Sequence, residues 1–321
     1  MKRILILVFV IASTPFVWAQ QQEQYSMYMM NNFMVNPAEA GTEEFADILV
    51  GYRTQWVGFD GAPRTFFLSG HTPIGKKTSR FDDVKQLPFH GAGGIVTGDQ
   101  IGPFRITTVK AAYAYHLPVT KDLILSLGAF VGAKQYTLDL GAIEFDDQGG
   151  ADNKFNQTQT VMTPDVSFGF WGYSSKYYFG ISAFQLLQSD VKLGDQSAPG
   201  AGADGKLDIH SWVTAGYNFK IDSNFSVIPS FVVKFVSPAP VSYDINAKLR
   251  YKDQYWVGVS YRGGDAVVGI VGLTAKKIID IAYAYDFTTS NIKNFSTGSH
   301  EILVGLRLAN HPDAPPPAQF W

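Results

Sequence analysis

The stretch Val241–Tyr251, which reads VSYDINAKLRY, changes character at every residue. Its apolar members are Val241, Tyr243, Ile245, Ala247, Leu249 and Tyr251, and the polar residues between them are Ser242, Asp244, Asn246, Lys248 and Arg250. Only an extended strand sorts such a series onto two faces, because successive Cβ atoms point to opposite sides of a sheet. An apolar face opposite a charged face, repeated along an exported chain, is typical of a transmembrane β-barrel.

Segments of the same kind recur from Asp47 to Leu308 without a linker, so we predict one all-β domain, a transmembrane antiparallel β-barrel over residues 47–308. The segments number about 14, an even count of the kind found in single-chain bacterial barrels. They cover 47–56, 64–71, two stretches that begin near 90 and 104, 123–136, 164–172, 177–187, 209–219, 226–235, 241–251, 255–262, 266–275, 279–286 and 301–308.

The connections between these segments alternate in length. Short ones are predicted at 118–122, 174–176, 220–224, 252–254 and 276–277, and long ones rich in Gly, Asp or Asn at 140–158, 189–206 and 288–299. In bacterial barrels the short turns face the periplasm and the long loops face outward. We therefore expect both termini on the periplasmic side.

The first 19 residues have the features of a secretory signal. Lys2 and Arg3 precede the apolar stretch Ile4–Val17, and Ala19 ends a small-residue cleavage site. The apolar stretch is shorter than the ~20 residues that a spanning helix needs, which favours cleavage over anchoring. We expect Sec-type export and location in the bacterial outer membrane, and the absence of cysteine excludes disulfides.

Composition agrees with a barrel and excludes a nucleic-acid surface. The formal net charge is only -2 and the basic residues are dispersed along the chain. The mean hydropathy of -0.01 resembles that of a soluble protein. Barrels reach such an average because each strand has one lipid face and one wet face.

Two segments lie outside the strand pattern. Residues 20–46 are polar and rich in methionine, and are predicted to be periplasmic or lumenal. Residues 309–321 form a tail that contains Pro315, Pro316 and Pro317, and proline cannot continue a sheet ladder. This tail is expected either to be disordered or to dock on another surface.

The charges assigned to the inner face of the barrel are mixed in sign. They comprise Arg53, Lys110, Lys134, Lys248, Arg250, Arg262 and Arg307 against Asp244, Asp280, Asp286 and Glu301. A selective pore is lined by one dominant sign, whereas mixed charges can pair across a filled lumen. The mixture favours a closed scaffold over an open anion channel.

No catalytic or metal-binding motif is present. The six histidines show no zinc-ligand spacing, and no Ser/His pair lies in a recognisable motif, so we predict a protein that is not an enzyme and has no cofactor. The outward loops carry oxygen ligands at Asp146, Asp147, Asp152, Asn153, Asp204 and Asp208. Calcium in these loops is the less favoured alternative to solvated turns, because neither stretch fits an EF-hand loop.

Four motifs in order resemble one known family. They are Gln24–Met29 (QYSMYM), Asn36–Gly41 (NPAEAG), Tyr52–Pro63 (YRTQWVGFDGAP) and Ser69–Pro73 (SGHTP). Later in the chain, Gly98–Phe104 (GDQIGPF) and Ala112–Pro118 (AYAYHLP) continue the match. Together they resemble the PorP/SprF family of Bacteroidetes over nearly the whole chain. The resemblance implies an outer-membrane barrel of the type IX secretion and gliding-motility apparatus. It implies partners too: a secreted cell-surface adhesin with a type-B C-terminal sorting domain, other secretion components, and a periplasmic peptidoglycan-associated protein.

The stretch Gln55–Pro63 is the best candidate for a partner-binding region. Its candidate residues are Gln55, Trp56, Gly58, Phe59, Gly61 and Pro63. The glycines and the proline fix an unusual backbone, and the two aromatic side chains offer area of the kind that anchors partners. The equally weighted alternative is a tight turn between strands with aromatic residues at the membrane interface.

Two functions therefore compete, with a membrane-embedded hydrolase a distant third. The first is a scaffold that helps to secrete and hold an adhesin at the cell surface. The second is a passive porin or solute transporter of the outer membrane. Conductance in a planar bilayer without a partner protein discriminates between them.

Overall fold

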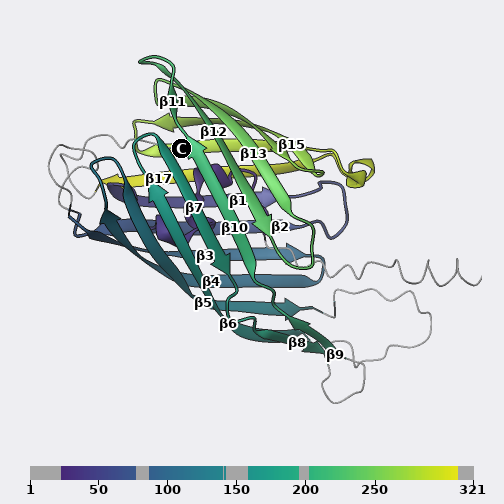
Figure 1. The fold of residues 1–321 in the computed structure, drawn as a ribbon. Helices are drawn as coiled ribbons and strands as arrows, with labels where there is room; N and C mark the ends of the chain where they lie inside the picture. Colours follow the sequence, from purple (N-terminus) through teal and green to yellow (C-terminus); the bar gives the residue numbers. More distant parts are fainter. Residues whose placement is uncertain (1–22, 77–86, 140, 142–157, 195–201, 310–321) are drawn as a thin grey trace, which may run out of the picture.

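The computed structural model describes residues 23–76, 87–139, 141, 158–194 and 202–309, and its strands close into a barrel (Figure 1). The main sheet holds fifteen strand segments in the order β10-β7-β6-β5-β4-β3-β2-β1-β17-β16-β15-β14-β13-β12-β11, and β10 also pairs with β12. Because β11 continues β10 past Asn218, the barrel has fourteen antiparallel strands. The predicted fold class and strand number are confirmed.

The strands have the following bounds: β1 Phe45–Thr54, β2 Arg64–Ile74, β3 Phe89–Ile101, β4 Phe104–Pro118, β5 Ile124–Leu138, β6 Gln159–Tyr173, β7 Tyr177–Phe184, β10 His210–Tyr217, β11 Phe219–Lys220, β12 Phe225–Phe235, β13 Ser242–Tyr251, β14 Tyr255–Arg262, β15 Ala266–Ala275, β16 Ile279–Thr288 and β17 Ser299–Ala309. Each overlaps one of the predicted segments. Two antiparallel pairings complete the ring: β1 with β17, from Phe45↔Ala309 to Thr54↔His300, and β10 with β12.

The alternation that identifies Val241–Tyr251 is the alternation of the barrel wall. In β13 the even-numbered residues from Asp244 to Arg250 are buried, and the odd-numbered residues from Tyr243 to Leu249 are exposed. The eleven charges assigned to the inner face are all buried, none with more than 8% of its surface exposed. Their placement inside the barrel was therefore predicted correctly from periodicity alone.

The structure corrects several details. The strand β1 ends at Thr54, so Trp56 lies in the following loop rather than on the strand, with a φ of 45°. The predicted loop 189–206 contains a separate hairpin, β8 (Asp190–Gly194) and β9 (Gly202–Lys206). Its apolar side chains Val191 and Leu193 pack against residues of β5 and β6, and this packing gives the hairpin its stability.

The two ends of the barrel differ. One end, here named the loop end, carries the connection Gln55–Pro63 and those after β3, β5, β7, β12, β14 and β16. The opposite end, here named the turn end, carries the start of β1, the end of β17 and mostly short connections. Three connections depart from the predicted alternation: 75–88 between β2 and β3 is long and lies at the turn end, whereas 102–103 and 263–265 are short and lie at the loop end.

Among the described residues no helix is long or apolar enough to cross a membrane. Short 3-10 turns are η1 Tyr28–Met30, η2 Asn32–Met34, η3 Pro37–Glu39 and η6 Asn291–Asn294. The predicted signal segment 1–19, the tail 310–321 and the candidate calcium ligands Asp146, Asp147, Asp152 and Asn153 lie outside the described residues.

Candidate functional site

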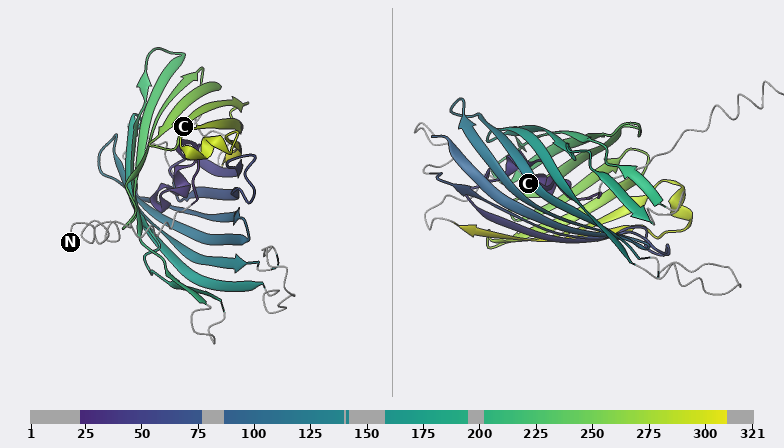
Figure 2. Two further views of the ribbon diagram at one scale, coloured as in Figure 1. Left: turned by 90° about the vertical axis from the view of Figure 1, so that its right-hand side faces the viewer. Right: turned by 90° about the horizontal axis from the view of Figure 1, so that it is seen from below.

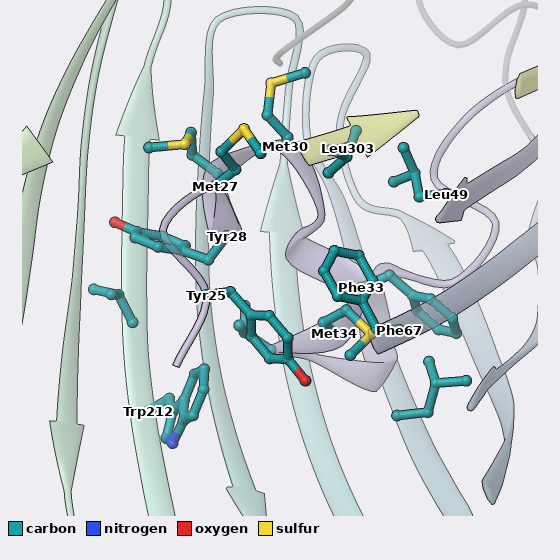
Figure 3. Packing of buried hydrophobic residues seen from close by; sticks show 14 of the residues in the cluster. Tyr25, Met27, Tyr28, Met30, Phe33, Met34, Leu49, Phe67, Trp212 and Leu303 are labelled. Atoms are coloured by element: carbon teal, nitrogen blue, oxygen red, sulfur yellow. The ribbon is translucent and has the colours of Figure 1, made fainter. Parts of the chain in front are cut away.

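The N-terminal segment Tyr25–Glu43, here named the plug, lies inside the barrel (Figure 2). Every residue of the plug is buried. Figure 3 shows how its Met and aromatic side chains pack against Leu49, Phe67 and Leu303 of the wall. The ring centroids of Tyr25 and Phe67 are 5.1 Å apart in an edge-to-face arrangement, which aromatic pairs favour. A lumen filled in this way is a packed core.

The plug runs from the loop end to the turn end. Ser26 contacts Glu301 and Asp286, which lie near the loop end of β17 and β16. Fifteen residues later, the N–H of Gly41 donates to Nδ1 of His71, close to the turn end of β2. The chain then enters β1 at Phe45. The plug therefore spans much of the height of the lumen.

The motif Asn36–Gly41 gives the plug its most defined turn. Asn36 is the N-cap of η3 and its side-chain oxygen accepts from the N–H of Ala38, while Pro37 occupies the first helical position, where its missing N–H costs nothing. The Asn36 amide donates in turn to the carbonyl oxygens of Phe170 and Ile181. One side chain thus shapes the plug and fastens it to β6 and β7.

Further polar contacts fasten the part of the plug nearer the turn end to the surrounding strands. Nε2 of His116 lies 2.7 Å from the carbonyl oxygen of Ala40, Ser126 Oγ donates to that of Ala38 at 2.6 Å, and Ser182 Oγ donates to that of Val35 at 2.6 Å. Nε2 of His71 lies 3.2 Å from Oε2 of Glu39. The contacts of His116, Ser126 and Ser182 satisfy plug carbonyl groups that would otherwise be buried without partners.

Glycines of the wall give the plug room to approach. A Cβ on Gly91 would lie 1.8 Å from the carbonyl oxygen of Ala40, and one on Gly128 would lie 2.5 Å from Cα of Ala38. Both distances are far below van der Waals contact. The wall of β3 and β5 is therefore shaped to accept this segment of the same chain.

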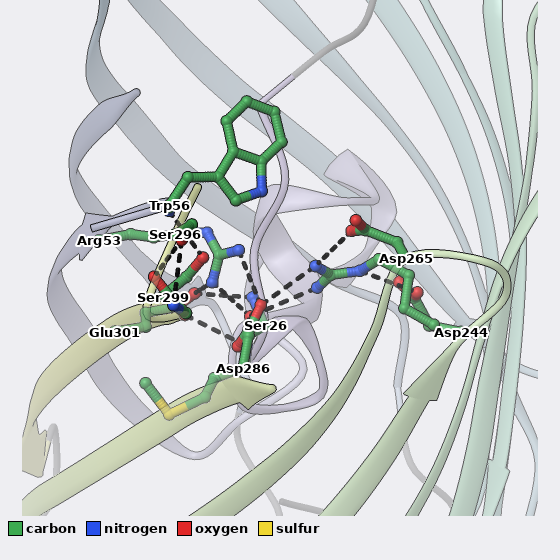
Figure 4. Close-up of polar contacts among 12 residues, drawn as sticks. Ser26, Arg53, Trp56, Asp244, Asp265, Asp286, Ser296, Ser299 and Glu301 are labelled. Carbon is green, nitrogen blue, oxygen red and sulfur yellow. Dashed lines mark hydrogen bonds and ion pairs between the residues drawn. The ribbon is translucent and has the colours of Figure 1, made fainter. Parts of the chain in front are cut away.

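A network of buried charges holds the part of the plug that lies near the loop end (Figure 4). Arg53 donates to Asp286 at 2.8 Å and to Glu301 at 3.3 Å. Ser26 lies between them: its N–H donates to Glu301 at 2.7 Å, its hydroxyl donates to Asp286 at 2.7 Å, and its Oγ accepts from Arg53. Arg262 extends the network, since it donates to Asp286 and to Asp244 at 3.2 Å each.

The network explains why the inner charges are mixed in sign. Each of these side chains is almost completely buried, and burying an unpaired charge costs several kcal/mol, about 3–5 when one partner of a buried pair is removed. Opposite charges from β1, β13, β14, β16 and β17 therefore meet around a single plug residue, Ser26.

Burial also raises the pKa of the Tyr28 phenol well above its ordinary value, so this plug side chain stays neutral.

Two cavities beside the plug are small. A cavity of about 30 Å³ lies between the plug and Thr97, Thr108, Lys110 and Lys134, and another of about 10 Å³ lies beside Met30 and Asp47. Cavities of this size hold one or a few water molecules. Within the described part of the chain, these interior spaces offer no room for a larger solute.

The loop Gln55–Pro63 is held against two neighbouring loops. The N–H of Val57 donates to the carbonyl oxygen of Gly298 at 2.8 Å, and the N–H of Thr297 donates back to that of Val57 at 2.9 Å. On its other side the N–H of Gly102 donates to the carbonyl oxygen of Gly61 at 2.9 Å. These bonds make the loop a fixed part of the loop end.

The six candidate residues of this loop differ in accessibility. Gln55 and Pro63 are buried, Trp56 and Gly58 are partly exposed, and Phe59 and Gly61 are exposed, with 48% of Phe59 accessible. Gly58 and Gly61 have φ values of 98° and 72°, which bears out the expected unusual backbone. Of the six, Gln55 and Pro63 therefore contribute little to the exposed surface of the loop.

The plug contacts were not found from the sequence as a site. The signal was nevertheless present, because two of the four family motifs, Gln24–Met29 and Asn36–Gly41, lie within or next to the plug. The plug has no period of alternating apolar and polar residues, so its place inside the barrel cannot be predicted from such a period. Among the described residues no group of three or more His, Asp or Glu side chains could hold a metal ion.

Solved barrels share the fold. A Pseudomonas aeruginosa FadL homologue has a TM-score of 0.52 at 13% identity, over 88% of this chain and 94% of that one. The CymD monoaromatic hydrocarbon channel has a TM-score of 0.51 at 13% identity, over 89% and 93%. The Ralstonia pickettii toluene transporter TbuX has a TM-score of 0.50 at 12% identity, over 88% and 93%. At such identities the likeness shows the fold alone.

Sequence comparison gives the family. No curated protein is similar enough in sequence to serve as a relative. The family model described as type IX secretion system membrane protein PorP/SprF matches residues 17–306, which is most of the chain. The chain therefore belongs to the PorP/SprF family and is a β-barrel protein of the bacterial outer membrane.

Proposed function

We propose that this protein is a non-enzymatic scaffold of type IX secretion that helps to secrete a cell-surface adhesin and holds it at the surface. The adhesin carries a type-B C-terminal sorting domain. Family membership supports other components of the secretion system as partners. A periplasmic peptidoglycan-associated protein is the partner proposed for the turn end.

The single observation that carries the proposal is the filled lumen. The plug occupies the interior, its Ser26 is bound by charges from several strands, and the two cavities described beside it have room only for water. A barrel closed in this way is suited to present its loops to a partner. Its mixed inner charges pair with one another instead of lining a path for one sign of ion.

The loop end is proposed to face outward and the turn end the periplasm. The short connections of the turn end fit this orientation, since short periplasmic turns are general in bacterial barrels. The adhesin would then meet the loop end. Phe59 is the candidate anchor there, because it is exposed on a loop that backbone hydrogen bonds hold in place.

The test is a strain that lacks the gene and is complemented by the gene on a plasmid. The proposal expects the adhesin to be lost from the surface of the deletion strain and restored by the plasmid. It also expects the adhesin to copurify with this protein in mild detergent. Normal display of every type-B adhesin in the deletion strain would count decisively against the proposal.

A second candidate function is a passive porin or solute transporter. It is favoured by two structural neighbours with the same fold, a toluene transporter and a monoaromatic hydrocarbon channel. The packed plug speaks against it. Reconstitution of the wild-type protein alone in planar bilayers separates the two functions, because a porin gives stable conductance and a closed scaffold does not.

A further inference from the structure

The outer wall of the barrel carries an apolar groove. It runs over the outward faces of β7, β10, β12 and β13, which lie side by side in Figure 1. Its volume is about 690 Å³, within the range of ~300–1,000 Å³ that is usual for ligand pockets. The lining includes Tyr177, Ala215, Tyr217, Pro229, Phe231 and Tyr243.

The groove has a local cause in the sequence. Its lining combines the small residues Ala215 and Gly216 and the proline Pro229 with bulky aromatic side chains. Pro229 has no N–H to donate, and in the described sheet the β10–β12 ladder ends at Gly216↔Ser230 and resumes only at Phe219↔Val227 of β11. The β10–β12 ladder is thus interrupted where the groove lies.

The surroundings of the groove indicate its occupant. The groove opens on the face that contacts the hydrocarbon of the membrane, and its lining is almost entirely apolar. Apolar surface alone gives no drive for a second protein to bind there, because lipid chains are as apolar as the side chains they touch. The groove must instead be filled by the lipid chains that surround the barrel.

Two exposed lysines that suit a phosphate lie next to one end of the groove, outside its lining. Tyr177 and Tyr217 pair directly at the turn end of β7 and β10, and tyrosines at this level are typical of the membrane interface. The exposed Lys176 precedes Tyr177, and its carbonyl oxygen accepts from the N–H of Asn218. The exposed Lys220 follows on β11, so two cations lie at the same end.

We propose that this groove is a binding site for one glycerophospholipid of the leaflet at the turn end. An acyl chain lies in the groove between Tyr217 and Phe231, and the phosphate lies near Lys176 and Lys220. The site is separate from the plug and from the loop end. It binds lipid whether or not the protein takes part in adhesin secretion.

The test is native mass spectrometry of the full-length protein, purified in mild detergent and titrated with phosphatidylglycerol. Ala215→Phe fills the groove from the lipid side. The matched control is Ala129→Phe, which places the same side chain on the outward face of β5, between Tyr113 and Phe168. We expect one retained lipid for the wild type and for the control, and about tenfold weaker retention for Ala215→Phe.

A second variant tests the phosphate end. Lys176→Gln together with Lys220→Gln should weaken phosphatidylglycerol severalfold while the binding of diacylglycerol, which lacks the phosphate, stays unchanged. Circular dichroism checks that both variants remain folded, and their spectra are expected to match that of the wild type. Equal retention by Ala215→Phe and Ala129→Phe, or no lipid retained by the wild type above the detergent background, would overturn the proposal.

Discussion

Arg53 of β1 and Asp286 of β16 form an ion pair of 2.8 Å inside the barrel, and both side chains bind the hydroxyl of Ser26 in the plug. Strands far apart in the sequence are thereby joined to the N-terminal segment at one point. The pair is 1–2% exposed, so its charges depend on each other for solvation. The stability of the wall and the position of the plug are coupled through these groups.

Arg53→Ala tests that coupling. It leaves Asp286 and Glu301 without their shared cation in a buried site, and the loss of one partner of a buried pair costs about 3–5 kcal/mol. We expect a clear fall in the unfolding temperature of the detergent-solubilised protein, followed by circular dichroism. The control is Arg64→Ala, which removes an exposed arginine from the adjacent strand β2 and should change stability little. Equal unfolding temperatures for the two variants would contradict the coupling.

Ser26→Asp should loosen the plug more than Ser26→Ala. The alanine variant only loses hydrogen bonds to charged groups, worth about 1.5–3 kcal/mol, whereas the aspartate adds a carboxylate beside those of Asp286 and Glu301. We expect proteolysis within the plug to be slow in the wild type, faster in the alanine variant and fastest in the aspartate variant. If all three are equally protected, the network does not hold the plug.

The wall could be predicted from the sequence because its side chains follow a period of two. Lys248 and Arg250 were assigned to the inner face from that period alone, and both are buried. The end of β1 could not be predicted in this way. Trp56 continues the apolar pattern, but its positive φ takes it out of the strand, and no period contains that information.

The plug could not be placed from the sequence for a related reason. Asn36 and Pro37 predict a capped turn wherever they occur, but they do not say which surface the turn meets. That surface is formed by Gly91, Gly128 and Ser126 on distant strands, and only the closed barrel brings them together. Long-range packing decides such a site, and the family motifs indicate only that the segment matters.

Gly91→Val should displace the part of the plug nearer the turn end. The new side chain would overlap the carbonyl of Ala40, and overpacking of this kind costs about 1–3 kcal/mol. The matched control is Gly98→Val on the same strand, where a Cβ meets no atom within 4 Å. Thermal unfolding of both variants measures the difference. A fall in stability of equal size at the two positions would show that the cause is a general effect of a larger side chain on β3, not contact with the plug.

Cysteine labelling tests the proposed orientation. The chain has no cysteine, so single substitutions give an unambiguous signal. Asp60→Cys lies on the exposed loop after β1, and Ser223→Cys lies on the exposed turn after β11, at the opposite end. With a membrane-impermeant maleimide on intact cells we expect labelling of the first variant only, and of both after lysis. Labelling of Ser223→Cys alone on intact cells would reverse the orientation.

Phe59→Ala tests the outward surface. Nearly half of this side chain is exposed on a loop fixed by Gly298 and Gly102, so its removal deletes aromatic contact area without loosening the barrel. If Phe59 anchors the adhesin, truncation should cost about 2 kcal/mol or more, which lowers surface retention at least about tenfold. The amount of adhesin on intact cells, relative to the amount released into the medium, measures this retention.

The control is Phe219→Ala, which removes a similarly exposed phenylalanine at the turn end, where only lipid or periplasm is expected. Equal retention by Phe59→Ala and the wild type would remove Phe59 as an anchor and favour the alternative assignment of this loop to the interfacial aromatic belt.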